Sequence, residues 1–370
     1  MHIGIDLLWV RPGICGGTES YIRNLMSGFA LYDDKNKYTL FVAEDNADSF
    51  KYYEKNDNMA LHICPVKCAS QPKRILWENL HLDKTARKVG VDVMFIPVYS
   101  KPRSNGKIPY VSVIHDLQAL HYPEYFSFAR RCFLKYSWKR TCKKSAKVVT
   151  ISEYCKKDMI QNYPYVKDKA YTIYNPIISD GKTADFTELE QKYQIHKNGY
   201  FYCVSSMLPH KNIKTVLQVM GQWEGDEKLV LSGVGQKNDD FQAILQEYGI
   251  EDKVILTGFV SDAWRDSLYE NCKLFLFPSV FEGFGMPPIE AMRKGKRVVM
   301  TRKSCLEEVT QGKAVYVDEP FDADEWIRKM KDAMACEEKK QGFEEYELQY
   351  VTEKYVEALT DENIGLHGNL

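Results

Sequence analysis

The stretch LFLFPSVFEGFGMPPIEAM, residues 274–292, decides the fold. Its first four residues are apolar and predict a buried strand, two glycines follow in a turn, and two prolines open a helix. A strand that leads through such a turn into a helix is typical of a parallel α/β sheet. The amides of Phe284, Gly285 and Met286 are the donors that this helix start would offer to a phosphate, because proline has no N–H.

The same alternation of short apolar runs and helical segments extends along the whole chain. We expect strands at residues 2–9, 38–42, 91–97, 110–115 and 147–151, and again at 200–204, 228–231, 254–256, 274–277 and 297–299. Residues 175–185 contain Asn-Pro and Asp-Gly without an apolar period, so they predict a hinge. The sequence therefore predicts an α/β chain of two Rossmann-like, doubly wound domains, residues 1–180 and 181–342, which face a central cleft. Residues 343–370 would form a C-terminal helix that returns to the first domain.

Composition excludes several classes of protein. The chain has 370 residues, 44% of them apolar, and a net charge of −1, which suits two buried cores and no nucleic-acid partner. No apolar run approaches the roughly 20 residues that span a bilayer, and the start of the sequence does not resemble a signal peptide. Ten scattered cysteines without a Cys-x-x-Cys pair indicate free thiols. We expect a cytoplasmic protein.

Two carboxylates in the stretch at 274–292 are candidate ligand-binding groups. Glu282 lies in the turn and Glu290 lies one turn into the helix, so both can line the same wall. Carboxylates accept charge-assisted hydrogen bonds from sugar hydroxyls. A structural alternative for Glu290 is a simple interaction with the helix dipole.

Further motifs lie at corresponding strand ends: Gly16-Gly17-Thr18-Glu19, His115-Asp116, Ser152-Glu153, Lys211-Asn212, Gly258-Phe259-Val260-Ser261 and Leu306-Glu307-Glu308-Val309. Together with the Glu-x7-Glu spacing, this set closely resembles glycosyltransferase family 4 over nearly the whole chain. The resemblance implies the GT-B fold and retaining transfer of a hexose from a nucleotide sugar. The tract from Ile114 to Leu117 with His121 to Glu124 is similar to that of bacterial surface-polysaccharide mannosyltransferases. It favours GDP-mannose over UDP-glucose and a glycan or lipid-linked oligosaccharide as acceptor.

The resemblance also implies roles for individual residues. Glu290 would bind the ribose, Glu282 the transferred sugar, and the turn amides of residues 284–286 the diphosphate. Lys211 would place a positive charge on the departing diphosphate, and His115 would lie near the reacting carbon. Residues Gly16 and Gly17 would form a loop that approaches the diphosphate and the acceptor, or only a structural tight turn. No metal and no cofactor is implied.

One position departs from the family pattern. Ser206 stands where an arginine usually precedes the lysine by five residues, so Arg265 and Arg297 are candidates for the missing charge. Two other hypotheses follow from this departure and from the fold: a catalytically silent partner subunit, and a sugar-nucleotide epimerase of GT-B architecture.

Two further motifs suggest other chemistry. Asp322-Ala323-Asp324 matches a metal-binding pattern, but its place before a helix favours a helix cap. Gly233-Val234-Gly235 is a partial dinucleotide motif in the second domain, where NAD binding is not expected.

The expected helix at residues 127–145 carries a stripe of cations. Arg131, Lys135, Lys139 and Lys143 recur every four residues, and Lys147 continues the spacing. Arg130, Arg140 and Lys144 would broaden the stripe, and five aromatic residues are interleaved with it: Phe126, Phe128, Phe133, Tyr136 and Trp138. The pattern predicts either peripheral contact with an anionic membrane, at the inner face of the plasma membrane, or a solvated helix face with its aromatics packed inward.

Overall fold

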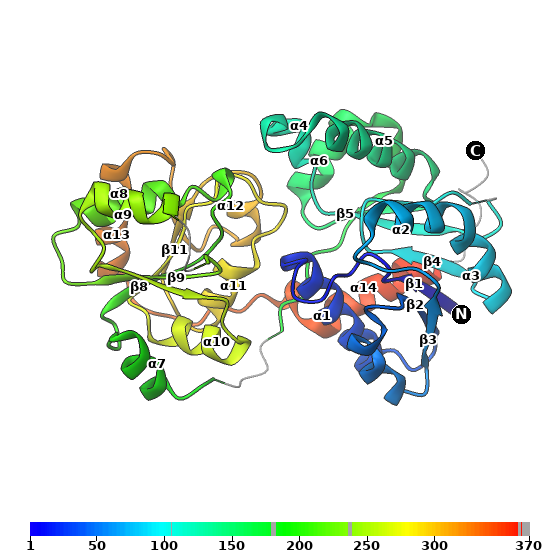
Figure 1. Cartoon of the computed structure of the whole chain (residues 1–370), viewed down its shortest axis with the longest axis horizontal. Helices are drawn as coiled ribbons and strands as arrows, with labels where there is room; N and C mark the ends of the chain where they lie inside the picture. The colour runs from blue at the N-terminus through cyan, green and yellow to red at the C-terminus, as the bar shows by residue number, and fades with distance from the viewer. Residues whose placement is uncertain (105, 179–182, 236–238, 362–363, 365–370) are drawn as a thin grey trace. The chain divides into compact units, whose positions relative to one another are not determined.

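The computed structural model describes residues 1–104, 106–178, 183–235, 239–361 and 364. The chain divides into an N-terminal unit, Met1–Ile178 with Glu344–Leu370, and a C-terminal unit, Ser179–Phe343 (Figure 1). The boundary lies within the segment 175–185 that the sequence marks as a hinge, of which residues 179–182 lie outside the described part.

The N-terminal unit is built on a seven-stranded parallel sheet with the order β3-β2-β1-β4-β5-β6-β7. The strands are β1 (His2–Asp6), β2 (Lys37–Ala43), β3 (Met59–Cys64), β4 (Val93–Ile96), β5 (Tyr110–Ile114), β6 (Lys147–Thr150) and β7 (Ala170–Thr172). Its helices are α1 (Gly17–Tyr32), α2 (Gln71–Trp77), α3 (Asp83–Val89), α4 (Gln118–His121), α5 (Phe128–Lys144), α6 (Glu153–Asn162) and α14 (Leu348–Thr360). The strand order reverses between β1 and β4, which marks the switch point where ligands of such sheets bind.

The C-terminal helix packs on the N-terminal unit, as the sequence predicts, and lies beside α1 in Figure 1. Tyr21 of α1 donates from its hydroxyl to the hydroxyl of Tyr355 at 2.8 Å, and both side chains are buried. Gly28 permits the close approach, since a Cβ there would lie 2.0 Å from the Thr352 hydroxyl oxygen. The helix begins at Leu348 rather than near residue 343, and Phe343 itself belongs to the C-terminal unit.

The C-terminal unit repeats the architecture with a six-stranded parallel sheet of order β10-β9-β8-β11-β12-β13. The strands are β8 (Tyr200–Val204), β9 (Lys228–Ser232), β10 (Val254–Gly258), β11 (Leu274–Phe277), β12 (Val298–Thr301) and β13 (Val315–Val317). Its helices are α7 (Phe186–Tyr193), α8 (Ile213–Gln222), α9 (Asp239–Tyr248), α10 (Asp262–Asn271), α11 (Met286–Arg293), α12 (Leu306–Val309) and α13 (Ala323–Ala335). Here the order reverses between β8 and β11. The predicted α/β class with two doubly wound parallel sheets is confirmed.

Some element bounds differ from the sequence prediction. The first strand ends at Asp6 rather than Trp9, because the Leu8 amide donates to the Asp6 carboxylate and the Trp9 indole donates to the Asp6 carbonyl. Lys147 begins β6 instead of extending the helical stripe, and its ammonium pairs with Asp361 at 2.6 Å. Within the described residues, no helix combines the length and the apolar character needed to cross a membrane.

Candidate donor site

The candidate donor site lies at the switch point of the C-terminal sheet. Strands β8 and β11 are hydrogen-bonded neighbours, with Leu274 opposite Phe201. Parallel strands end at the same edge of a sheet, so the loops after these two strands meet although they are far apart in the sequence. The first loop leads to Lys211 and the second contains Glu282.

Backbone contacts fix the two loops against each other. The carbonyl of His210 accepts hydrogen bonds from the Val280 amide at 2.8 Å and from the Ser279 hydroxyl at 3.2 Å. Asn212 follows with a left-handed backbone, φ 52°, and its side chain donates to the carbonyl of Pro320 at 2.8 Å. Lys211 is therefore held between two residues with fixed positions.

Lys211 and Glu282 form an ion pair, with 2.6 Å between Nζ and Oε1. Their side chains are only 22% and 14% exposed, so solvent screens the pair weakly. The Glu282 amide donates to the Ser304 hydroxyl at 3.0 Å, which anchors the carboxylate-bearing turn. The structure thus joins two residues that the family resemblance assigns to neighbouring parts of a nucleotide sugar.

The turn between the two glutamates has a fixed conformation. Gly285 has φ 93°, and a Cβ at this position would lie 2.9 Å from a Leu306 methyl carbon, so a glycine is required. The Phe284 side chain is buried, and its carbonyl accepts a hydrogen bond from the Cys305 thiol at 3.2 Å. Met286 is the first residue of α11, followed by the two prolines.

Glu290 lies on α11 with its own set of partners. Its carboxylate accepts a hydrogen bond from the Tyr269 hydroxyl at 3.0 Å, and Arg265 Nε lies 3.6 Å from the same oxygen. Burial raises the pKa of Glu290, while the nearby Arg265 charge opposes the shift. These specific contacts go beyond the simple helix-dipole interaction considered from the sequence.

The structure separates the two arginines proposed to replace the charge missing at Ser206. Arg297 donates to the carbonyls of Met334 and Cys336 at 2.8 and 3.0 Å, so it stabilises the C-terminal end of α13. Arg265 lies beside Glu290 and pairs with Asp262 at 2.9 Å. Ser206 itself is in the loop that follows β8. Of the two, Arg265 is the arginine at the candidate site.

Asp322 caps a helix. Its carboxylate accepts hydrogen bonds from the amides of Asp324 and Glu325 at 2.9 and 3.2 Å, at the start of α13. The sequence prediction of a helix cap for Asp322-Ala323-Asp324 is therefore confirmed.

His115 follows β5 in the N-terminal unit. Its Nε2 is 2.8 Å from the carbonyl oxygen of Pro97, and its ring packs edge-on against Tyr21 with centroids 4.9 Å apart. Burial lowers the pKa of His115 to about 4. A carbonyl can only accept, so Nε2 carries the proton of the neutral ring and Nδ1 is an acceptor.

This buried histidine predicts a stability change with pH. The unfolded chain takes up a proton near the normal histidine pKa of 6.5, whereas the folded chain does so only near 4, so the free energy of unfolding falls as pH decreases from 6.5 to 4. Between pH 7 and pH 5 the wild type should lose free energy of unfolding because of this histidine. We expect His115→Gln to make that loss smaller by about 1–2 kcal/mol, as measured by urea unfolding. His196→Gln is the control, since that side chain is 87% exposed. Equal slopes for wild type and His115→Gln would contradict the prediction.

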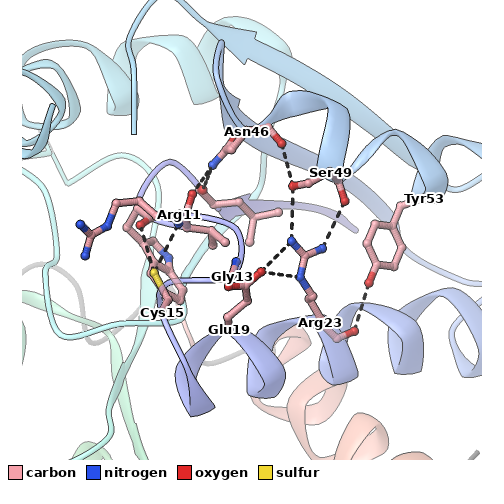
Figure 2. Close-up of polar contacts among 11 residues, drawn as sticks. Arg11, Gly13, Cys15, Glu19, Arg23, Asn46, Ser49 and Tyr53 are labelled. Atoms are coloured by element: carbon pink, nitrogen blue, oxygen red, sulfur yellow. Dashed lines mark hydrogen bonds and ion pairs between the residues drawn. The ribbon is translucent and has the colours of Figure 1, made fainter. Parts of the chain in front are cut away.

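Gly16 also belongs to the N-terminal unit and ends the loop between β1 and α1, whose polar contacts are drawn in Figure 2. Gly16 has φ 57° and ψ −138°, a conformation that is essentially restricted to glycine, and Gly17 starts α1. The loop is held from within, because the Glu19 carboxylate accepts from the Gly13 amide at 2.9 Å and from Arg23 at 2.8 Å. Glu19 therefore shapes the loop.

Comparison with known families agrees with this geometry. Residues 15–180 match the model described as Glycosyltransferase Family 4, and residues 185–349 match the model described as Glycosyl transferases group 1. The chain belongs to glycosyltransferase family 4. The two matches correspond closely to the two units, and the second includes both Lys211 and the segment from Glu282 to Glu290.

Individual relatives are similar over part of their length. An O-antigen chain mannosyltransferase of Salmonella typhimurium is 27% identical over 64% of each chain, and O-antigen chain mannosyltransferase B of Escherichia coli is 31% identical over 58% of each. The alignments thus span less than two thirds of these relatives. A Campylobacter jejuni relative, whose name specifies transfer of N-acetylgalactosamine to a diphospho-undecaprenol-linked sugar, is 27% identical over 44% of this chain and 42% of its own.

Solved structures show the same fold. Anabaena HepE in complex with UDP and glucose superposes with a TM-score of 0.64 at 18% identity, covering 97% of this chain and 99% of that one. WaaG, a glycosyltransferase of lipopolysaccharide biosynthesis, gives a TM-score of 0.66 at 14% identity, covering 99% and 97%. The chain therefore has the two-domain GT-B fold.

Proposed function

We propose that the chain is a retaining hexosyltransferase that moves a hexose from a nucleotide sugar to a glycan or lipid-linked oligosaccharide in surface-polysaccharide synthesis. The observation that carries the proposal is the ion pair of Lys211 and Glu282 at the switch point of the C-terminal sheet, beside the turn into α11. It provides a cation for a diphosphate and a carboxylate for sugar hydroxyls in one place. The mannosyltransferase relatives support the assignment to surface polysaccharides.

The proposed reaction depends on charge and position. Lys211 stabilises the negative charge that develops on the departing diphosphate, while Glu282 orients the transferred sugar. Donor binding exchanges the Lys211–Glu282 contact for contacts with the diphosphate and the sugar. Neutral His115 accepts a hydrogen bond from a sugar hydroxyl at Nδ1. The acceptor hydroxyl attacks the face that the diphosphate leaves, and the departing phosphate takes its proton.

GDP-mannose is the proposed donor, with UDP-glucose next. A thermal-shift panel of nucleotide sugars tests this, because a ligand that binds the folded state raises the melting temperature by mass action. We expect GDP-mannose to give the largest increase, and a panel without any increase would contradict a nucleotide-sugar site. Incubation with the donor alone distinguishes transfer from the epimerase hypothesis, since only an epimerase converts the sugar without an acceptor. Donor binding without turnover would instead support the silent-subunit hypothesis.

We expect activity to persist in excess EDTA. The proposed diphosphate site consists of amides and Lys211 rather than a bridging metal ion. Asp322, the first residue of the metal-like motif, already caps α13. Transfer rates with and without chelator provide the measurement, and a complete loss that added metal reverses would contradict the assignment.

The stripe on α5 supports a peripheral membrane contact at the cytoplasmic face. Lys135, Lys139 and Lys143 are exposed, and Phe128 and Tyr136 beside them are 74% and 57% exposed. Trp138, by contrast, is buried and Phe133 is half-buried. The helix therefore combines exposed cations with two exposed aromatic rings, as an interfacial helix requires.

We expect the chain to sediment with anionic liposomes at low salt and not with neutral ones. Three lysines near a leaflet contribute about 1 kcal/mol each, so Lys135→Glu/Lys139→Glu/Lys143→Glu should release the protein. The matched control replaces three exposed lysines of the C-terminal unit, Lys197, Lys214 and Lys331, by glutamate. Equal sedimentation of both triple variants would show that the stripe is not responsible.

A further inference from the structure

A cavity of about 310 Å³ lies at the switch point of the N-terminal sheet. Its walls include Trp9 and Arg11 from the loop after β1, and Val98 to Ser100 from the segment after β4. Helix α1 contributes Thr18, and helices α2 and α5 contribute Arg74, Ile75, Arg130 and Phe133. The N-terminal unit thus contains a hollow at the place where doubly wound sheets bind ligands.

Three arginines line this cavity, and its lining contains no aspartate or glutamate. Within the described part of the chain, neither Arg11 nor Arg130 has a carboxylate at ion-pair distance, whereas Arg74 pairs with Glu78 at 2.5 Å. Arg130 donates to the Tyr99 hydroxyl at 2.7 Å, a neutral partner that does not balance the guanidinium charge. Two arginine charges in the wall are therefore uncompensated.

The loop that carries Arg11 is held in place by other residues. Asn46 donates to the carbonyl of Val10 at 2.7 Å, and the Arg11 amide donates to the Cys15 sulfur at 3.3 Å. Figure 2 shows the Arg11 guanidinium pointing away from the polar contacts that hold the loop. The Arg11 side chain is half-buried. The loop therefore holds a cation in place, although the contacts that fix the loop do not involve the Arg11 guanidinium.

Arg74 adds a third, buried guanidinium, only 9% exposed. Its Nε has no hydrogen-bond partner within the described residues, and neither has Oδ2 of buried Asp6. Burial raises the pKa of both Asp6 and Glu78, while the nearby Arg74 charge opposes the shift. Arg74 therefore belongs to a buried ion pair in the cavity wall, and the uncompensated charges are those of Arg11 and Arg130.

Apolar surface accompanies these charges. Trp9, Ile75 and Phe133 line the same cavity. Arginine forks bind phosphate oxygens in pairs, and apolar walls accommodate the group that carries the phosphate. A free inorganic anion would leave the apolar walls unused, and an uncharged glycan would leave the charges of Arg11 and Arg130 without an anion to balance them.

We propose that this cavity binds a phosphate or diphosphate ester of the acceptor, with Arg11 and Arg130 as the principal cationic contacts. The inference rests on the proposed transferase function and specifies the chemical class of its acceptor. The ester can come from a lipid diphosphate or from a sugar phosphate, which share the chemistry that these arginines recognise.

Cys15 gives a readout that requires no catalysis. It lines the cavity and is a half-buried free thiol, whereas Cys132 and Cys336 are the exposed ones. In a Cys132→Ser/Cys336→Ser background, the alkylation rate of Cys15 by iodoacetamide is measured by mass spectrometry on the full chain. The probes are farnesyl diphosphate, mannose 6-phosphate and inorganic pyrophosphate, with farnesol as the uncharged control.

We expect saturating farnesyl diphosphate or mannose 6-phosphate to slow alkylation at least fivefold, and the stronger of the two identifies the source of the ester. Arg11→Gln and Arg130→Gln, singly and together, should raise the probe concentration that gives half-maximal protection about tenfold or more, as expected for loss of a charge-assisted contact. Arg103→Gln is the matched control, since Arg103 is exposed and outside the cavity. Melting temperatures verify that the variants are folded.

Three results would overturn the inference: equal protection by farnesol, protection that survives the double arginine variant, or protection that Lys211→Ala abolishes. The last result would assign the effect to the donor site. The chain could also transfer no sugar from any donor while Cys15 protection still requires Arg11 and Arg130. That result would support the anion site and contradict the proposed function instead.

Discussion

Replacing Lys211 by alanine is expected to slow sugar transfer by about 10²- to 10³-fold, or about 2.7–4 kcal/mol, and Glu282→Ala should have a similar effect. In the proposed reaction the ammonium stabilises charge that appears only as the diphosphate departs, so the substitution should lower kcat. The pair is largely shielded from water, which increases the contribution of each charge. Steady-state rates with saturating donor and acceptor provide the measurement.

Two controls separate catalysis from folding. Lys214→Ala removes an exposed lysine three positions further along the chain, and its turnover should equal that of the wild type. The double variant Lys211→Ala/Glu282→Ala should lose much less than the product of the two single effects, because the residues are in contact. Wild-type turnover in either single variant, with an unchanged melting temperature, would remove that residue from the mechanism.

The central strands of both sheets could be predicted because they are buried on both faces. Runs such as Leu274–Phe277 are apolar without interruption, and their residues are buried in the structure. The strands that the sequence analysis missed are edge strands. Met59–Cys64 has a mixed burial pattern, while Ala170–Thr172 and Val315–Val317 have only three residues each. A strand of three residues, or one with a mixed burial pattern, gives too weak an apolar signal, so its pairing depends on the neighbouring strand.

The donor site was predictable residue by residue but not as a set of contacts. The resemblance named Lys211, Glu282 and Glu290, yet the ion pair joins residues that are 71 positions apart. The strand order of a doubly wound sheet brings those two loops together, and that order depends on tertiary packing. The contacts of Glu290 with Tyr269 and Arg265 required the position of α10, which sequence periodicity does not give.

The helix from Phe128 to Lys144 shows what a charge pattern misses. The sequence groups Arg130 and Arg140 with the exposed stripe, but Arg130 lines the cavity and Arg140 donates to the carbonyls of Lys101 and Pro102 at 3.2 Å. The exposed side of the helix carries Lys135 and Lys139, while its inner side contributes Arg130 to the cavity. Side-chain direction on the helix, rather than charge, distinguishes the two roles.

Both units place cationic side chains at the switch point of their sheet, but the two sites differ in how far carboxylates balance those cations. At the switch point of the C-terminal sheet, Lys211 is matched by Glu282, so the diphosphate of the proposed donor would compete with a carboxylate for the lysine. At the switch point of the N-terminal sheet, Arg11 and Arg130 line a cavity without acidic side chains. The first arrangement suits a diphosphate that binds and then leaves with an additional negative charge. The second suits a phosphate group that stays attached to the substrate throughout the reaction.

Glu290→Gln is expected to weaken donor binding by about 10- to 150-fold, since a hydrogen bond to a charged group contributes about 1.5–3 kcal/mol. The family resemblance assigns this carboxylate to the ribose hydroxyls. The substitution keeps the size of the side chain and removes its charge, so the increase should appear in the KM for the nucleotide sugar more than in kcat. Isothermal titration with the donor measures the binding directly.

The fold should tolerate this change. Arg265 retains Asp262 as an ion-pair partner at 2.9 Å, so removal of the Glu290 charge does not leave the guanidinium without a carboxylate. Tyr269→Phe is the matched control, because it deletes only the hydroxyl that donates to Glu290 and should weaken the donor by a few-fold at most. The donor Kd should therefore increase in the order wild type, Tyr269→Phe, Glu290→Gln. If Glu290→Gln binds the nucleotide sugar as tightly as the wild type while Tyr269→Phe does not, the carboxylate has a structural role and the ribose contact lies elsewhere.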